Sequence, residues 1–169
     1  AEVRSAVAGP VNLNFFCHTL PHGVDERRWR AALSHYYTEY GVLPPEDPPL
    51  LRQPFGSELC ELVEELRPAV VSFHFGLPEE RLLARVKATG ATVLASATTV
   101  AAARWLADQG VDAVIAQGWE AGGHASHILP DDAAAPMALM ALLPQMADAI
   151  DVPVIAAGGI ADARGIAAA

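Results

Sequence analysis

The sequence contains little cysteine, few basic side chains and no long apolar run. Only Cys17 and Cys60 occur among the 169 residues, without a CxxC spacing, so neither a disulfide framework nor a structural zinc site is expected. The 11 Lys and Arg residues are outnumbered by 20 Asp and Glu residues, which gives a net charge of −9 and disfavours nucleic acid as a partner. No apolar run reaches the roughly 18–20 residues of a membrane-spanning helix, and no signal peptide is recognisable. We therefore expect a cytoplasmic domain with neither nucleic-acid nor membrane partners.

The sequence contains enough hydrophobic residues to form one buried core. Hydrophobic residues make up 52% of the chain, in regularly spaced runs of Val, Ile and Leu. Residues 1–10 resemble the end of a helix that runs into a strand, and residues 165–169 stop within a helical pattern without a capping Gly or Asn. We therefore expect the chain to be part of a longer protein.

Strand-like and helix-like segments alternate along the chain. Apolar, β-rich runs predict strands at residues 11–16, 69–75, 91–95, 112–116 and 152–157. Helical periodicity predicts helices at residues 25–40, 57–66, 78–90, 98–110 and 137–150, and a further helix after Asp162. Three positions are expected to act as helix N-caps, namely Ser57, Thr98 or Thr99, and Asp162. Pro78 is expected at the first position of its helix, and the prolines between residues 44 and 54 predict an irregular loop.

Single helices between almost uniformly apolar strands indicate a parallel α/β sheet, because each right-handed crossover requires one helix. An open doubly wound sheet and a (β/α)8 TIM barrel both fit, and the sequence has neither a G-x-G-x-x-G fingerprint nor a Walker A loop. Polar or glycine residues recur where the predicted strands end, namely Asn12 and Asn14, His74 to Gly76, Ser96 to Thr98, Gln117 and Gly118, and Gly158 and Gly159. A barrel gathers such ends at one mouth. We favour a barrel in which residues 1–169 form an incomplete domain of about five strand–helix units, with a helical, proline-rich excursion at about 18–57.

Two glycine pairs follow predicted strands at this mouth. Gly122 and Gly123 precede His124, an imidazole suited to proton transfer near neutrality. Gly158 and Gly159 could present backbone N–H groups to an anion or a phosphate. The alternative for each pair is an ordinary turn between strand and helix, with His124 exposed.

For the remaining histidines, the sequence gives weaker evidence of a functional role. His74 lies between Phe73 and Phe75, and it would face the barrel interior if both Phe rings packed outward against helices. The alternative is a buried histidine satisfied by a neighbour. We expect four histidines to be solvated, His18, His22, His35 and His127, and the run Tyr36, Tyr37 and Tyr40 to pack. No spacing of His, Cys and carboxylates indicates a metal site, and no G-x-S-x-G elbow is present.

Five segments in order resemble the nitronate monooxygenase family, formerly called 2-nitropropane dioxygenases. They are the Val-Asn-Leu segment around Asn12, residues 70–78, residues 97–99, residues 117–124 with the specific motif Glu-Ala-Gly-Gly-His, and residues 157–162. The resemblance implies an FMN-dependent TIM barrel that oxidises alkyl nitronates with O2 to carbonyl compounds and nitrite. It implies that His124 is the catalytic base and that His74 lies in the substrate pocket. The cofactor-binding residues that it implies are Asn12, Gln117, Gly122, Gly123, Gly158 and Gly159.

The chain also departs from the family pattern. Ala125, Ser126 and His127 follow the motif where the family usually has a small residue and Gly, which leaves the substrate preference open. The family's first strand and its last two strands have no counterpart in the sequence. Two alternatives stay open: an FMN- and NADH-dependent enoyl-acyl-carrier-protein reductase, which shares the Gly-Gly-His motif, and a non-catalytic barrel fragment that binds no flavin.

Overall fold

The computed structural model describes residues 8–21, 23, 25–43, 51–134 and 136–169. These residues form two compact units, of which one contains residues 8–18 and 55–169 and the other contains Thr19–Pro54. Parts of two predictions, the helix end within residues 1–10 and the loop prolines between residues 44 and 50, lie outside the described residues, as does His22. Each unit is described by itself.

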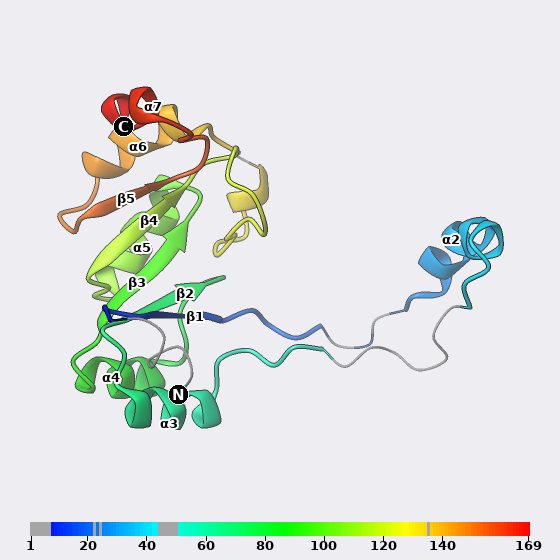
Figure 1. Ribbon diagram of the computed structural model, residues 1–169, viewed down its shortest axis with the longest axis horizontal. Coiled ribbons are helices and arrows are strands. Elements are labelled where there is room, and N and C mark those ends of the chain that lie inside the picture. Colours follow the sequence, from blue (N-terminus) through cyan, green and yellow to red (C-terminus); the bar gives the residue numbers. More distant parts are fainter. Residues whose placement is uncertain (1–7, 22, 24, 44–50, 135) are drawn as a thin grey trace. The chain divides into compact units, whose positions relative to one another are not determined.

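The larger unit is built on a five-stranded parallel sheet whose strands follow one another in chain order (Figure 1). The strands are β1 (Asn12–Phe16), β2 (Val70–His74), β3 (Thr92–Ala97), β4 (Ala113–Gln117) and β5 (Val154–Ala157). The parallel sheet and all five predicted strands are confirmed. Doubly wound sheets reverse their strand order at a switch point, whereas barrels do not. The unbroken order from β1 to β5 is therefore that of a partial TIM barrel.

Helices connect the strands at the predicted places. They are α3 (Ser57–Leu66), α4 (Glu80–Ala88), α5 (Val100–Asp108), α6 (Leu139–Ala147) and α7 (Ala163–Ala168), and the loop before α6 contains the short 3-10 helix η1 (Asp132–Ala134). None of the described helices is long and apolar enough to cross a membrane.

The predicted helix starts are partly confirmed. The Thr99 hydroxyl accepts the Ala102 N–H at the start of α5, and the Asp162 carboxylate accepts the Arg164 N–H at the start of α7, as N-caps do. The prediction for Ser57 is wrong, because extended Gly56 occupies the N-cap position and Ser57 is the first helical residue. The prediction for Pro78 is also wrong: α4 begins only at Glu80, since Glu79 still has an extended ψ of 143°.

The two faces of the sheet differ in chemistry because side chains alternate along each strand. Val71, Phe73, Val93, Ala95 and Val114 are on one face and belong to the buried core that packs against the helices. The opposite face is the inner face of the partial barrel. It carries polar side chains from several strands, listed as Asn12, Asn14, Ser72, His74, Ser96 and Gln117. The alternation thus separates a packing face from a face on which chemistry can occur.

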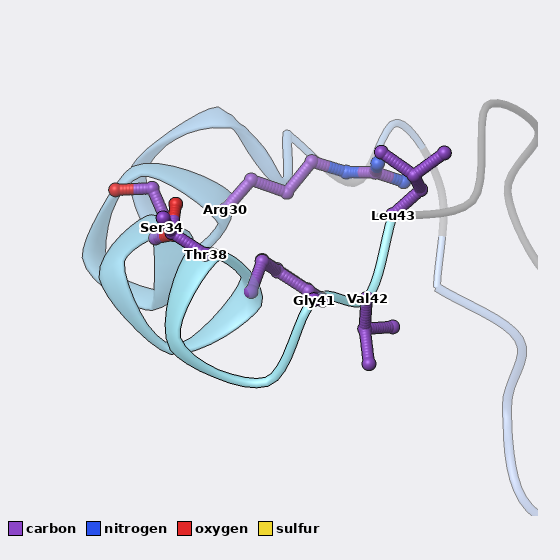
Figure 2. A pocket seen from close by; sticks show the side chains of 7 residues that line it. Arg30, Ser34, Thr38, Gly41, Val42 and Leu43 are labelled. Carbon is purple, nitrogen blue, oxygen red and sulfur yellow. The ribbon is translucent and has the colours of Figure 1, made fainter.

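The smaller unit contains α2 (Arg27–Glu39), whose ends agree with the predicted helix to within two residues. Within this unit the helix has no buried residue and Trp29, Tyr36 and Tyr40 are exposed, and the expected packing of the tyrosines stays a prediction. Figure 2 shows a shallow hollow of about 420 Å³ beside the helix, with the Arg30 side chain extending toward Leu43. None of the predicted site residues lines this hollow.

Candidate functional site

Three predicted site residues meet at the carboxyl ends of the strands. His74 ends β2, Gln117 ends β4, and His124 lies in the loop after β4. The Gln117 Nε2 atom donates a hydrogen bond of 2.8 Å to the His124 carbonyl oxygen, and the His74 Nε2 atom lies 2.9 Å from the same oxygen. Because a carbonyl oxygen only accepts, this contact requires the proton of His74 to be on Nε2. Two side chains from different strands thus hold the backbone of His124.

The environment of His74 disfavours its charged form. Burial lowers the pKa of the imidazole below its usual value, and the nearby His124 also lowers it, while the hydrogen bond to the His124 carbonyl acts in the opposite direction. His74 is half-buried, with Phe73 packed outward in the core as the sequence predicts. A neutral His74 donates to the His124 carbonyl oxygen without placing a positive charge beside the His124 ring.

Phe75 does not pack outward against the helices, so the condition under which His74 was expected to face the interior holds for Phe73 only. Its φ of 64° lies in the left-handed region, and the next residue, Gly76, has a φ of 97°. A bulky residue in this region costs about 1–3 kcal/mol. The unusual backbone ends the alternation of β2 and turns the Phe75 ring toward His74 (4.5 Å between ring centroids) instead of toward the core.

The His124 ring packs against two aromatic rings that also contact each other, with 5.2 Å between the Phe16 and Phe75 ring centroids. Phe16, the last residue of β1, and Phe75 each have a ring centroid 5.7 Å from that of His124, at interplanar angles of 66° and 85°. Such edge-to-face contacts are favourable for aromatic pairs. His18 contacts the same two Phe rings and is half-buried, so the expected solvation of His18 is wrong, whereas His35 and His127 are exposed as expected.

Ser126 connects three of the loops at this rim and is absent from the predicted site. Its side chain is fully buried, and its hydroxyl accepts the Phe75 N–H (3.0 Å) and donates to the Ser96 carbonyl oxygen (3.0 Å). Its own N–H donates to the Gln117 Oε1 atom (2.8 Å). The sequence signal was present, since Ser126 is where the chain departs from the family pattern after the histidine.

The two glycine pairs lie on loops that touch one another. A Cβ atom on Gly158 would approach the Ala121 nitrogen to 2.9 Å, and one on Gly159 would lie 3.4 Å from the Glu120 Cβ atom. Gly158 and Gly159 have φ values of 126° and 66°, which only glycine adopts readily. The loops after β4 and β5 thus approach too closely for side chains at Gly158.

Acidic side chains stabilise the starts of the helices after these loops. The Glu120 Oε2 atom accepts the Leu139 N–H (2.9 Å) at the start of α6, so the acidic residue of the Glu-Ala-Gly-Gly-His motif has a structural partner. The Asp162 carboxylate occupies the start of α7 and pairs with the exposed Arg164. A phosphate near α7 would therefore meet the backbone of the glycine pair, and not the helix terminus.

A partly enclosed hollow of about 250 Å³ lies at the ends of β3 and β4. Gln117 and Gly123 line it together with Thr98, Trp119 and His127, whereas His124 does not. The Thr98 side chain is 92% buried, and among the described residues its hydroxyl has no hydrogen-bond partner. Buried hydroxyl groups are normally paired, so the Thr98 hydroxyl is available to a bound molecule or water. From the sequence, Thr98 is predicted as a helix cap or as one of the polar residues at the barrel mouth, and not as a residue of the binding site.

Asn12 lies away from this rim. The prediction that it follows its strand is wrong, because Asn12 is the first residue of β1 and Phe16 is the last. They are four positions apart along the strand, which corresponds to roughly 13 Å. The Asn12 Nδ2 atom donates to the Ser72 hydroxyl, which in turn donates to the Asn14 Oδ1 atom, both at 2.9 Å. Its role in cofactor binding stays a prediction.

Metal chemistry has no support in the described part of the chain, where no group of three or more His, Cys, Asp or Glu side chains could hold an ion. Both cysteines are unsuited to act as nucleophiles. Burial raises the pKa of the Cys17 thiol to about 12 and also raises that of the fully buried Cys60, so both remain protonated near neutrality. The histidines at the rim are therefore the available acid–base groups.

Comparisons with known proteins agree with this arrangement. A model of the nitronate monooxygenase family matches residues 1–169. The nitronate monooxygenase of Paraburkholderia phytofirmans is 41% identical over 174 residues, which cover 99% of this chain and 47% of that protein. The nitronate monooxygenase of Pseudomonas aeruginosa is 41% identical over 182 residues, which cover 99% of this chain and 49% of that protein. The chain spans about half the length of these curated relatives.

Solved structures give the same result. A nitroalkane oxidase from Streptomyces ansochromogenes matches with a TM-score of 0.84 and 34% identity, over 99% of this chain and 49% of that one. FabK from Thermotoga maritima matches less well, with a TM-score of 0.57 and 28% identity, over 87% of this chain and 44% of that one. The partial-barrel fold and the family resemblance are thereby confirmed. From the family model and the two curated relatives, we conclude that the chain belongs to the nitronate monooxygenase family.

Proposed function

We propose that the complete protein is a flavin-dependent oxidoreductase that oxidises alkyl nitronates with O2 to carbonyl compounds and nitrite. The observation that carries this proposal is the position of His124. Its carbonyl oxygen is held by Gln117 and His74, and its ring packs edge-on against Phe16 and Phe75 at the carboxyl end of the sheet. Active sites of TIM-barrel enzymes are located at this end.

The residues at the rim fit a flavin mononucleotide. The Gln117 amide and the unpartnered Thr98 hydroxyl border one hollow and could bond to polar ring atoms. Gly122 and Gly123 have open space where a Cβ atom would be, as close approach of a phosphate to the backbone requires. The same space at Gly158 and Gly159 adjoins Ala121 and Glu120, and their contact with the cofactor stays a prediction. When bound, the flavin supplies the electron transfer between substrate and O2. Asn12 completes the predicted cofactor set, although it lies at the other end of β1.

The chain's own residues would then bind the substrate and move a proton. The exposed His124 imidazole would accept a proton from the carbon that bears the nitro group, or as imidazolium would pair with a nitronate anion. His74, predicted for the substrate pocket, would keep the His124 backbone in place through its Nε2 proton. Phe16 and Phe75 would exclude water from one side of the imidazole.

The enoyl-reductase alternative has weaker support. FabK shares 28% identity with the chain, against 34% for the nitroalkane oxidase, and its TM-score is 0.57 against 0.84. Oxidation of NADH by the complete protein, with nitronates inert, would favour this alternative. The cytoplasmic location and the restriction of partners to a small substrate and O2 stay predictions.

His124→Ala in the complete protein tests the proposal. We expect the variant to retain the yellow flavin spectrum and to lose at least about 100-fold in nitronate turnover, because general-base catalysis contributes about 10²–10⁴-fold. Oxygen consumption with a secondary alkyl nitronate measures turnover. His35→Ala, at an exposed position of α2, is the matched control and should leave turnover unchanged. Unchanged turnover in His124→Ala would refute the role of His124, and a colourless protein indifferent to added FMN would refute the proposed function.

A further inference from the structure

The conformation of Phe75 lacks a local explanation. Among the described residues, Phe75 and Arg67 alone combine a side chain with a positive φ. Arg67 terminates α3, where its N–H donates to the Val63 carbonyl oxygen in the usual manner of a left-handed helix end. Phe75 directly follows a strand, so no helix end accounts for it. Such outliers persist only where surrounding structure holds them.

Ser126 is the residue that holds Phe75 in this conformation. The Phe75 N–H donates to the Ser126 hydroxyl at 3.0 Å, and that hydroxyl donates to the Ser96 carbonyl oxygen. The Ser126 N–H is bonded to Gln117, whose amide also holds the His124 carbonyl oxygen. Ser126 is fully buried, so water does not compete for these bonds. Through its hydroxyl and its backbone N–H, Ser126 thereby connects the ends of β2, β3 and β4.

Ser126 influences the position of the His124 imidazole in two ways. Ser126 lies two residues after His124, so its hydrogen bonds fix the chain that follows the histidine. It also fixes the turn that directs the Phe75 ring toward His124, at 5.7 Å and nearly perpendicular. The Ser126 hydroxyl thus holds the turn that positions the Phe75 ring, and the Ser126 N–H, through Gln117, holds the backbone of His124.

We propose that Ser126 and Phe75 form one positioning pair that sets the orientation of the His124 imidazole. Ser126 anchors the left-handed turn, and the Phe75 ring transmits that anchor to His124 by edge contact. The inference rests on the proposed function of His124 as the base. Neither residue contacts the reacting atoms in this role, and both act through His124.

The first experiment measures nitronate kinetics in the complete protein. Ser126→Ala removes the acceptor of the Phe75 N–H, and Phe75→Gly removes the ring while tolerating the positive φ. We expect each variant to lower kcat by about tenfold with little change in KM, because a misplaced base loses catalytic geometry and not substrate affinity. The double variant should lose little more than either single variant, since the two residues act as a unit. Phe75→Tyr keeps an aromatic ring at this position, so this variant should retain the wild-type kcat.

The second experiment is a proton NMR titration of the His124 imidazole, which needs no turnover. The signal is assigned by its loss in His124→Gln. His18 and His74 are the titratable groups whose rings lie in the same cluster, and the variants His18→Gln and His74→Gln remove their contributions one at a time. We expect both the titration midpoint and the chemical shift of His124 to change in Ser126→Ala and in Phe75→Gly.

Two control variants separate positioning from general stability. Ser57→Ala removes an exposed hydroxyl at the start of α3, and Phe55→Leu removes a buried ring that packs with Phe15 and Phe73 in the core. Phe55→Leu should lower the melting temperature without moving the His124 titration. Ser57→Ala should change neither quantity.

The outcomes distinguish the two proposals. Losses of kcat that multiply in the double variant, or an unmoved His124 titration in folded, flavin-binding Ser126→Ala, would overturn the positioning pair. If the wild-type protein does not turn over nitronates but its His124 titration moves in both variants, the proposed function fails and the positioning pair stands. The kinetic measurements therefore test both proposals, and the NMR titration tests the positioning pair without turnover.

Discussion

His74 is a half-buried imidazole whose protonation the folded chain disfavours. Burial is the main cause of its lowered pKa, while the hydrogen bond to the His124 carbonyl oxygen raises the pKa and the electrostatic effect of His124 lowers it. In the unfolded chain the same side chain has a pKa of about 6.5. The unfolded state therefore binds the proton at a higher pH than the folded state does. It follows that the contribution of His74 to stability is present above about pH 6.5 and is lost as the pH falls through the lowered folded pKa.

This residue therefore predicts a pH-dependent stability difference. Urea unfolding of the wild type and of His74→Gln, measured between about pH 8 and pH 5, should show a steeper loss of unfolding free energy in the wild type below about pH 6.5. Gln retains a side-chain N–H donor for the His124 carbonyl oxygen but does not titrate. Parallel pH profiles for the two proteins would contradict the lowered pKa.

The sequence identified some residues of the candidate site and missed others. His74, Gln117 and His124 were selected from the sequence because polar residues follow predicted strands, and the fold brings all three together. Phe75 and Ser126 were not selected, because strand periodicity assigned Phe75 to the packing face and because a buried serine gives no chemical signal of its own. Their roles depend on a left-handed turn that no local pattern predicted.

Among the elements, the loops after β4 and β5 are the most closely constrained near the candidate site. Gly158 adopts a φ of 126°, and a Cβ atom on Gly158 would lie 2.9 Å from the backbone nitrogen of Ala121. A rigid backbone atom at 2.9 Å cannot move aside as a flexible side chain could. The separation of the two loops is therefore set by the absence of a side chain at this position.

Gly158→Ala should push these loops apart. We expect it to destabilise the protein by about 1–3 kcal/mol through backbone strain. FMN affinity should also fall, by about tenfold or more, since backbone N–H groups on both loops are predicted to contact the cofactor. Quenching of FMN fluorescence measures the affinity, and urea unfolding measures the stability.

Gly9→Ala is the matched control, because Gly9 has open space around a Cβ and no positive φ. It should change neither quantity. Wild-type affinity and stability in Gly158→Ala would show that the approach of the two loops is not required for cofactor binding.

As a whole, the larger unit is a sheet with two open sides. In the described part of the chain, β1 pairs only with β2 and β5 pairs only with β4, so each outer strand presents an unpaired edge. Ile155 in β5 is 43% exposed on the inner face, where a closed barrel would cover it. Unpaired parallel edges and exposed apolar side chains favour association between chains.

We therefore expect the 169-residue chain, expressed by itself, to self-associate in a concentration-dependent manner. Sedimentation velocity at several concentrations measures this. Ile155→Lys, on the exposed inner face of β5, should reduce association by placing a charge there. A monomer at all concentrations would show that the edges are covered within the chain.

The sequence by itself determined the order of strands and helices, the parallel sheet and the family. These follow from local apolar periodicity, from Gly and Thr at helix ends, and from motifs of adjacent residues, all of which are properties of neighbours along the chain. Errors at this level were local as well. Ser57 and Pro78 each lie one or two residues from the position expected for them, because several residues near a helix start have similar capping preferences.

Only the tertiary structure decided which polar residues meet. It joined Ser126 to Phe75, Ser96 and Gln117 across 51, 30 and 9 positions of sequence, and it placed Asn12 at the opposite end of its strand from the rim. These contacts depend on the register of strands distant in the chain and on a strained turn that is stable only when its anchor is present. The physical reason is that periodicity reports which face a residue is on, while the pairing of loops is set by the packing of the whole sheet.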